Sequence, residues 1–137
     1  MTPDRLADIA ARAYRHMAPW TAQEFAETLA RAFVHLTHTE HAFVLATIIV
    51  DEAEILALAC DPDAQGTGEA SRALHAFERA AAGQGVTTVF LEVAAANTPA
   101  RAFYAKHGYE PAGLRKGYYP QPDGTRDDAV LMRKTLP

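Results

Sequence analysis

The stretch EILALACDPDAQGTGEASRALHAFERAAAGQGVTTVFLEV, residues 54–93, decides the fold. Its first part, Glu54–Cys60, has the composition of a strand, and the Asp-Pro-Asp at 61–63 ends that strand because proline cannot donate to a strand ladder. A glycine-containing loop at 65–68 then leads into a segment with apolar residues at helical spacing, which two glycines end. A β-branched strand follows at Val86–Val93. Strand, helix and strand in this order predict a parallel crossover unit.

Two helices and a meander of strands are predicted before this unit. Thr2-Pro3 supplies an N-cap and a first helical residue, and Thr21–Glu24 has the pattern of a capping box. Trp20, just before that cap, is placed to staple the second helix to the core. The β-rich segments Phe33–Thr37 and Phe43–Val50 are predicted as antiparallel strands that lead into the first strand of the unit.

One helix and two further strands are predicted after the unit. The helix begins at Asn97 or Thr98 and ends at Gly108. The strands lie around Tyr109–Lys116 and Ala129–Lys134. The fold class is therefore α/β, with a mixed central sheet of about six strands flanked by about four helices in a single domain.

Composition and charge narrow the class of protein. The 137 residues carry a formal net charge of -4 at pH 7, which offers no basic field to hold a nucleic acid. A single cysteine, Cys60, excludes an internal disulfide and gives no sign of an oxidising compartment. Charged residues interrupt the N-terminal segment, so it forms no secretory h-region, and the longest apolar stretch, Ala42–Val50, is too short to span a bilayer. We expect a cytoplasmic protein that binds neither nucleic acid nor membrane.

The loop between the first strand of the unit and its helix has the features of an anion site. A helix N-terminus presents unpaired N–H groups and the positive end of its dipole to whatever lies in the loop. The local spelling is Gln65-Gly66-Thr67-Gly68-Glu69-Ala70. A glycine turn that only joins a strand to a helix has the same spelling, so the loop alone does not define a function.

In this loop the sequence resembles the Gcn5-related N-acetyltransferase family. The pyrophosphate loop of that family reads Gln/Arg-x-x-Gly-x-Gly/Ala between its fourth strand and third helix, and Gln65, Gly68 and Ala70 fit this pattern. Downstream segments resemble the ribosomal-protein alanine N-acetyltransferase branch, and these are Leu91-Glu92-Val93, Asn97, Ala100, Phe103-Tyr104, Gly108-Tyr109, Tyr118-Tyr119-Pro120 and Asp123-Gly124 through Met132. The resemblance extends from Glu54 to the C-terminus, and Pro19-Trp20 fits as well.

This resemblance implies transfer of an acetyl group from the cosubstrate acetyl-CoA to a primary amine, by direct attack in a ternary complex. The implied acceptor is a protein or peptide N-terminal α-amine, such as that of a ribosomal protein, and no metal is implied. Glu92 is the implied general base, Tyr104 the implied general acid, and Asn97 the implied contact to the pantetheine or phosphate portion. A free strand backbone would pair with the pantetheine arm of the cofactor, and the implied residues are Leu58, Ala59 and Cys60. The loop would bind the pyrophosphate, and the implied residues are Gly66, Thr67, Gly68, Glu69, Ala70 and Ser71.

Both catalytic roles agree with the chemistry of acetyl transfer. An α-amine has a pKa of about 8, so at neutral pH it must lose a proton before it attacks the thioester. The departing thiolate leaves more readily when a nearby phenol protonates it. Each residue also has a structural interpretation, Glu92 as a solvent-facing strand residue and Tyr104 as a core aromatic. Glu54 is the rival base, because many members of the wider family place a carboxylate there, while Tyr118 and Tyr119 either border the acceptor groove or cap the sheet.

Two other functions stay open at this point. One is a non-catalytic acyl-CoA-binding or interaction module, and the other is a small-molecule amine acetyltransferase. A metal site at His35, His38 and His41 is not indicated, because these residues span a strand end and a turn rather than one helical face. Cys60 is interpreted as a small buried strand residue, since the sequence places no partner beside it that would make it a nucleophile.

Three departures from the family pattern bear on the site and on assembly. Gly66 and Thr67 stand where the branch usually carries two basic residues. Glu69 follows them, and its carboxylate would repel a pyrophosphate unless the side chain turns outward. The first strand of the family is absent, which leaves a sheet edge uncovered, and an exposed edge often recruits a partner chain. We therefore expect a homodimer or another covering of that edge.

Overall fold

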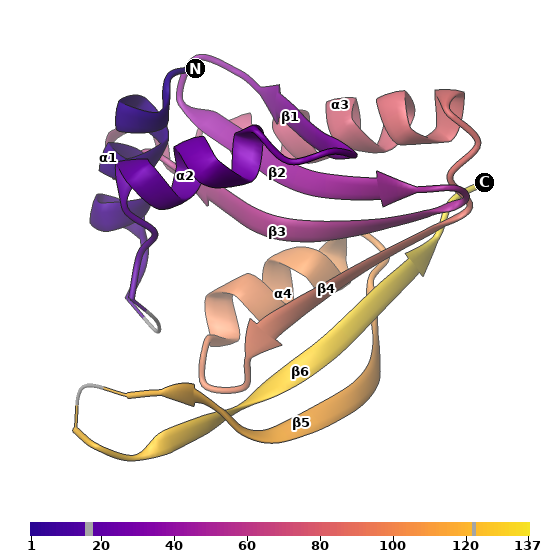
Figure 1. The fold of residues 1–137 in the computed structure, drawn as a ribbon. Helices are drawn as coiled ribbons and strands as arrows, with labels where there is room; N and C mark the ends of the chain where they lie inside the picture. The colour runs from indigo at the N-terminus through magenta and orange to yellow at the C-terminus, as the bar shows by residue number, and fades with distance from the viewer. Residues whose placement is uncertain (16–17, 122) are drawn as a thin grey trace.

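The computed structural model describes residues 1–15, 18–121 and 123–137 (Figure 1). Within these ranges a six-stranded sheet is flanked by four α-helices, which confirms the mixed α/β fold class. The helices are α1 (Pro3–Ala13), α2 (Ala22–Leu29), α3 (Glu69–Gly83) and α4 (Thr98–Lys106), with a short 3-10 helix at Pro62–Ala64. The strands are β1 (Val34–His38), β2 (Ala42–Ile49), β3 (Glu52–Cys60), β4 (Thr88–Ala94), β5 (Glu110–Pro120) and β6 (Arg126–Thr135).

The strands lie across the sheet in the order β1-β2-β3-β4-β6-β5. β3 and β4 are parallel, and the other neighbours are antiparallel. Helix α3 connects the two parallel strands, as the strand-helix-strand pattern predicts. Their register ends at the pair Ile55 and Leu91, although β3 continues to Cys60 and β4 to Ala94. The two strands therefore separate toward their carboxyl ends.

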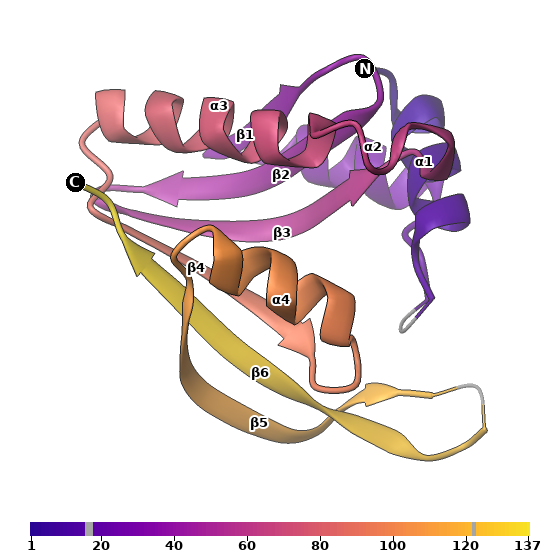
Figure 2. The same cartoon turned by 180° about the vertical axis from the view of Figure 1, so that it is seen from behind.

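Helices cover both faces of the sheet. α1 and α2 lie on one face, and α3 and α4 lie on the other (Figures 1 and 2). The first pair buries Leu6 and Phe25 against β2 and β3, while α3 buries Leu74 and Phe77 against the opposite face. Because β2 is covered on both sides, Ala42–Ala46 is completely buried, and its sequence is continuously apolar instead of alternating.

Capping residues determine where the two N-terminal helices begin. Thr2 caps α1 through its side chain, as predicted. In α2 the Glu24 N–H donates to Thr21 Oγ1 at 3.1 Å, and the Thr21 N–H donates to Glu24 Oε1 at 3.1 Å. This reciprocal pair is the predicted capping box. The ring centroids of Trp20 and Phe25 are 5.3 Å apart, so Trp20 packs on the core residue of α2 as expected.

Strand boundaries differ from the sequence prediction where the backbone turns. Phe33 has a φ of 67° and Val50 a φ of 57°, both in the left-handed region that is rare for bulky side chains. Each residue therefore lies in a turn, so β1 begins at Val34 and β2 ends at Ile49. The hairpin of β5 and β6 is longer than predicted, because its ladder resumes beyond a bulge.

β1 forms one edge of the sheet. It pairs with β2 over Val34–His38, and in the described ranges no strand pairs with its outer side. The side chain of Gln84, at the end of α3, reaches this strand with its Nε2 2.9 Å from Nε2 of His35. The first element of the described residues is α1. Homodimerisation through this edge stays a prediction.

Candidate active site

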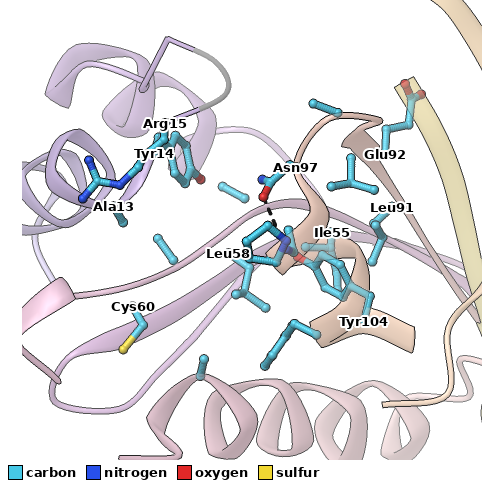
Figure 3. A pocket seen from close by; sticks show the side chains of 18 of the residues that line it. Ala13, Tyr14, Arg15, Ile55, Leu58, Cys60, Leu91, Glu92, Asn97 and Tyr104 are labelled. Carbon is cyan, nitrogen blue, oxygen red and sulfur yellow. Dashed lines mark hydrogen bonds between the residues drawn. The ribbon is translucent and has the colours of Figure 1, made fainter. Parts of the chain in front are cut away.

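A cleft opens where β3 and β4 separate. Beyond Ile55 and Leu91, β3 stays paired with β2 and β4 with β6, and the space between them has a volume of about 470 Å³. Figure 3 shows the side chains around it, from β3 and β4, the start of α4 and the end of α1. Leu91 and Glu92 both line the cleft, although neighbouring residues of a strand point to opposite faces. The edge of β4 therefore forms one wall of the cleft.

The β3 wall contains three of the residues assigned to the cofactor. Leu58, Ala59 and Cys60 all line the cleft, and the described register gives them no partner on β4. Backbone groups on that side are thus available to an extended ligand, which can add to the strand edge. Cys60 is buried, and burial raises the pKa of its thiol. The thiol stays protonated at neutral pH, in agreement with a structural role.

The glycine loop leads directly into α3. Gly66 and Gly68 have φ values of 82° and 83°, which glycine adopts without strain. Gly68 is the N-cap of α3, and the first backbone hydrogen bond of the helix runs from the Arg72 N–H to the Gly68 carbonyl at 3.0 Å. The N–H groups before Arg72 have no intrahelical acceptor, so the positive end of the helix dipole faces the loop. Gln65 and Ala70 line the cleft, with the turn of residues 66–68 beside it.

Glu69 is directed at the turn between β1 and β2. Its side chain is buried, and Oε1 accepts hydrogen bonds from Thr39 Oγ1 at 2.7 Å and from the His41 N–H at 3.0 Å. The hydrogen bond from Thr39 holds the pKa of this carboxyl below its usual value, so Glu69 remains charged. The carboxylate is thus held by the turn between β1 and β2 and points away from the loop. This geometry does not support repulsion of a pyrophosphate by Glu69.

Ser71 and Asn97, also assigned to the cofactor, make hydrogen bonds within the protein. Ser71 Oγ lies 2.9 Å from Nε2 of His107, the C-cap of α4, and Ser71 does not line the cleft. Burial lowers the pKa of His107, so its ring is neutral at pH 7. Asn97 does line the cleft, and its Oδ1 accepts the Ala100 N–H at 3.3 Å to cap α4 (Figure 3).

Tyr104 projects from α4 into the cleft. It is 8% exposed, and its ring centroid lies 5.3 Å from that of Phe103 and 5.6 Å from that of Tyr109, which fixes the ring. The hydroxyl points toward the β3 wall (Figure 3). Burial raises the pKa of this phenol above its ordinary value. The phenol of Tyr104 is therefore protonated at neutral pH.

Glu92 approaches the cleft from the other face of β4. Its carboxylate points away from the ring of Tyr104 (Figure 3). Oε1 accepts a hydrogen bond from Arg115 Nη2 at 2.9 Å, while Oε2 is buried and has no hydrogen-bond partner among the described residues. A buried oxygen without a partner is uncommon and costly, so Oε2 is the free acceptor of this site. The rival Glu54 is exposed on the same sheet face and pairs in register with Phe90.

Two further tyrosines border the cleft. Tyr119 lines it, and burial raises the pKa of its phenol to about 12. Tyr14, the C-cap of α1, also lines it and has a pKa raised by burial, although the sequence analysis gave this residue no role. Its position four residues after Ala10, on the apolar stripe of α1, is the signal that identifies it in retrospect. Tyr118 is 44% exposed and lies outside the cleft.

A bidentate ion pair ties α1 to the start of the loop. Arg12 Nη1 donates to Asp61 Oδ1 at 2.6 Å, and Nη2 donates to Oδ2 at 2.7 Å. The Asp61 side chain is 8% exposed, and its Oδ1 also accepts the Asp63 N–H at 3.0 Å. Asp61 follows β3 directly, and Arg12 lies two residues before Tyr14. The pair therefore joins the loop to the rim of the cleft.

Asp61→Asn is expected to lower the denaturant midpoint of unfolding far more than Asp8→Asn, which removes the exposed partner of the same arginine. The buried Asp61 would lose its bidentate charge-assisted hydrogen bonds to Arg12, whereas the exposed pair with Asp8 contributes little. The Arg12 hydrogen bonds hold the pKa of Asp61 well below its usual range, so the stabilisation is present above the unfolded-state pKa and is lost as pH falls through the folded-state value. The difference between wild type and Asp61→Asn should shrink in strong acid. Equal midpoints for the two variants would contradict this account.

His35 and His41 contact different segments of the chain. His35 lies beside Gln84, and Nδ1 of His41 lies 3.3 Å from Nη2 of Arg5. Over residues 1–15, 18–121 and 123–137, no group of three or more His, Cys, Asp or Glu side chains is arranged to hold a metal ion. In the same ranges no helix combines the length and apolar character needed to cross a membrane.

The separated parallel strands and the glycine loop agree with the family that the sequence resembles. The family model of the acetyltransferase (GNAT) family matches residues 6–109, so the chain belongs to this family and is an N-acetyltransferase. The [ribosomal protein bS18]-alanine N-acetyltransferase of Haemophilus ducreyi is 35% identical over 121 residues, which cover 85% of this chain and 83% of that protein. The protein of the same name from Escherichia coli (strain K12) is 34% identical, over 85% of this chain and 81% of its own length.

A comparison with a solved structure also places the chain beside the alanine N-acetyltransferases. The crystal structure of the ribosomal-protein-S18-alanine N-acetyltransferase from Escherichia coli matches with a TM-score of 0.85 and 32% sequence identity, covering 98% of this chain and 87% of that one. The resemblance to this branch is thus confirmed along nearly the whole chain.

Proposed function

We propose that the protein uses acetyl-CoA to acetylate the N-terminal α-amine of a protein that begins with alanine. The cleft between the separated ends of β3 and β4 is the observation that carries this proposal, because it joins a free strand edge, a helix N-terminus and a buried phenol. The names of the curated relatives state alanine acetylation of ribosomal protein bS18, which supports a ribosomal protein as acceptor.

The cosubstrate is proposed to lie along the β3 wall. Its pantetheine arm adds to the free edge of Leu58–Cys60, and its pyrophosphate lies at the loop 66–68 and the first turn of α3. Asn97, opposite this edge, has an amide nitrogen available to the arm, because its oxygen already caps α4. In this position the thioester is delivered to Tyr104.

The proposed reaction removes two protons from the ammonium nitrogen, and the balance is one proton on the sulfur of CoA and one released to solvent. Glu92 accepts a proton from the α-ammonium group, directly or through water, at its unpartnered Oε2. The free amine attacks the thioester carbonyl and the new C–N bond forms. As the C–S bond breaks, the nitrogen loses its second proton to solvent. Tyr104 donates its phenolic proton to the departing thiolate and regains one from solvent, since burial favours its neutral form. The products are the acetylated amine and CoA.

Calorimetry and intact-mass analysis test this function. We expect micromolar binding of acetyl-CoA and the addition of one acetyl group to a peptide with an N-terminal alanine. The same peptide with a blocked N-terminus is the control, and it should gain no mass even if it contains lysine. Acetylation of small amines but not of the peptide would contradict the proposal that the acceptor is a protein N-terminus. Absence of binding at millimolar acetyl-CoA would reject the enzyme function and favour an interaction module.

A further inference from the structure

The loop before α3 has no basic side chain of its own. Residues 65–68 are Gln, Gly, Thr and Gly, and the acidic Glu69 follows. A diphosphate carries negative charge on both phosphates, whereas backbone N–H groups and a helix dipole offer only partial positive charge. A full positive charge at this loop must therefore come from a side chain outside it.

Arg72, in the first turn of α3, folds back over the loop. Its Nη1 donates a hydrogen bond to the Thr67 carbonyl at 3.0 Å. The same nitrogen lies 3.1 Å from the position that a Cβ would occupy on Gly68, so glycine at this point permits the close approach. The guanidinium has five N–H donors, and Arg72 is exposed, which leaves donors available beside the loop.

The hydrogen bond to Thr67 also orients the next peptide group. In a trans peptide the carbonyl and the N–H point in opposite directions. With its carbonyl held toward Arg72, Thr67 turns the N–H of Gly68 to the opposite side of the loop. The Thr67 hydroxyl donates to the Ala64 carbonyl and fixes the same residue a second time. Arg72 thus acts on both the direction of a backbone donor and the charge around it.

We propose that Arg72 gives this loop its affinity for the diphosphate of CoA, by orienting the Thr67–Gly68 peptide and by supplying the positive charge that the loop lacks. This inference rests on the proposed function, because it presupposes that CoA binds here. Arg72 is a positioning residue that does not reach the reacting thioester. Its contribution should therefore appear only with ligands that carry the diphosphate.

The experiment compares Arg72→Gln with Arg79→Gln, which removes an exposed arginine two turns further along the same helix. Calorimetry measures the affinity for CoA and for 3′-dephospho-CoA, and NMR chemical shifts follow the weak binding of pantetheine. Arg72→Gln is expected to weaken binding of CoA and 3′-dephospho-CoA by about tenfold each, because it removes both the charged donor that orients the Thr67–Gly68 peptide and a full positive charge beside the loop. Pantetheine binding and the melting temperature should stay at the wild-type values. Arg79→Gln should behave as wild type with all three ligands.

Each deviation from this pattern has a definite meaning. Unchanged CoA affinity in Arg72→Gln overturns the proposal. If Arg72→Gln loses affinity for CoA but not for 3′-dephospho-CoA, Arg72 interacts with the 3′-phosphate, and the proposal is overturned as well. Equal loss with pantetheine shows general damage to the cleft, again against the proposal. If the wild-type protein binds no CoA at all, the proposed function itself fails, and this is seen before any variant is compared.

Discussion

Tyr104→Phe is expected to lower kcat by about ten- to a hundredfold while the affinity for acetyl-CoA is unchanged. The variant keeps the ring, which packs between Phe103 and Tyr109, and removes only the hydroxyl that points toward the β3 wall. Loss of a general acid typically costs a factor of this size or more, whereas a ring that only fills the core would lose almost no activity with the hydroxyl. Steady-state kinetics and calorimetry with acetyl-CoA separate the two quantities.

Tyr118→Phe is the matched control, because it makes the same chemical change at an exposed residue outside the cleft. Its kcat should equal that of wild type. Burial raises the pKa of Tyr104, so the acid form persists above the ordinary tyrosine pKa of about 10, and deprotonation of Tyr104 should not limit the wild-type rate at pH 9. A Tyr104→Phe enzyme with full kcat would remove this residue from the proposed mechanism.

The local features of the fold were predictable because their causes are local. A capping box needs only residues three apart, and Thr21 with Glu24 forms it as the sequence indicates. The Asp-Pro-Asp that ends β3 acts through the chemistry of proline and aspartate at those positions. The crossover through α3 follows from the order of the elements. Such signals are readable in a short window, so the fold class could be assigned before the structure.

Contacts between distant segments were not predictable in the same way. Nothing near Glu69 in the sequence indicates that Thr39 and His41 donate hydrogen bonds to its carboxylate, so the sequence left open whether this charge faces the loop or turns outward. The positive φ of Val50 is likewise imposed by the β2–β3 connection and opposes the local preference of a β-branched residue. Site residues on β4 and α4 came from the family resemblance, whereas Tyr14 became visible only when α1 was placed against the cleft.

Glu92→Gln is expected to reduce kcat/KM for the peptide by about a hundredfold at pH 7, since general base catalysis is worth factors of this order. Glutamine preserves the size of the side chain and an oxygen for Arg115, but it cannot accept the proton of the ammonium group. The deficit should shrink as pH rises through the amine pKa of about 8, because the free amine then forms without a base. Measurements of kcat/KM from about pH 6 to 9.5 show whether the activity of Glu92→Gln approaches that of wild type at high pH.

Glu54→Gln decides between the two carboxylates, because both lie on the same face of the sheet but only Glu92 lines the cleft. Glu54 is exposed and does not line the cleft, so its replacement should change kcat/KM by less than about twofold. The buried, unpartnered Oε2 of Glu92 is the reason to expect this asymmetry, since an oxygen left without a donor is free to take a proton from the acceptor amine. A large loss in Glu54→Gln, together with near-normal rates in Glu92→Gln, would transfer the role of base to β3. Proton removal would then occur on the same face of the sheet, but beside the paired part of β3 and β4 instead of at their separated ends.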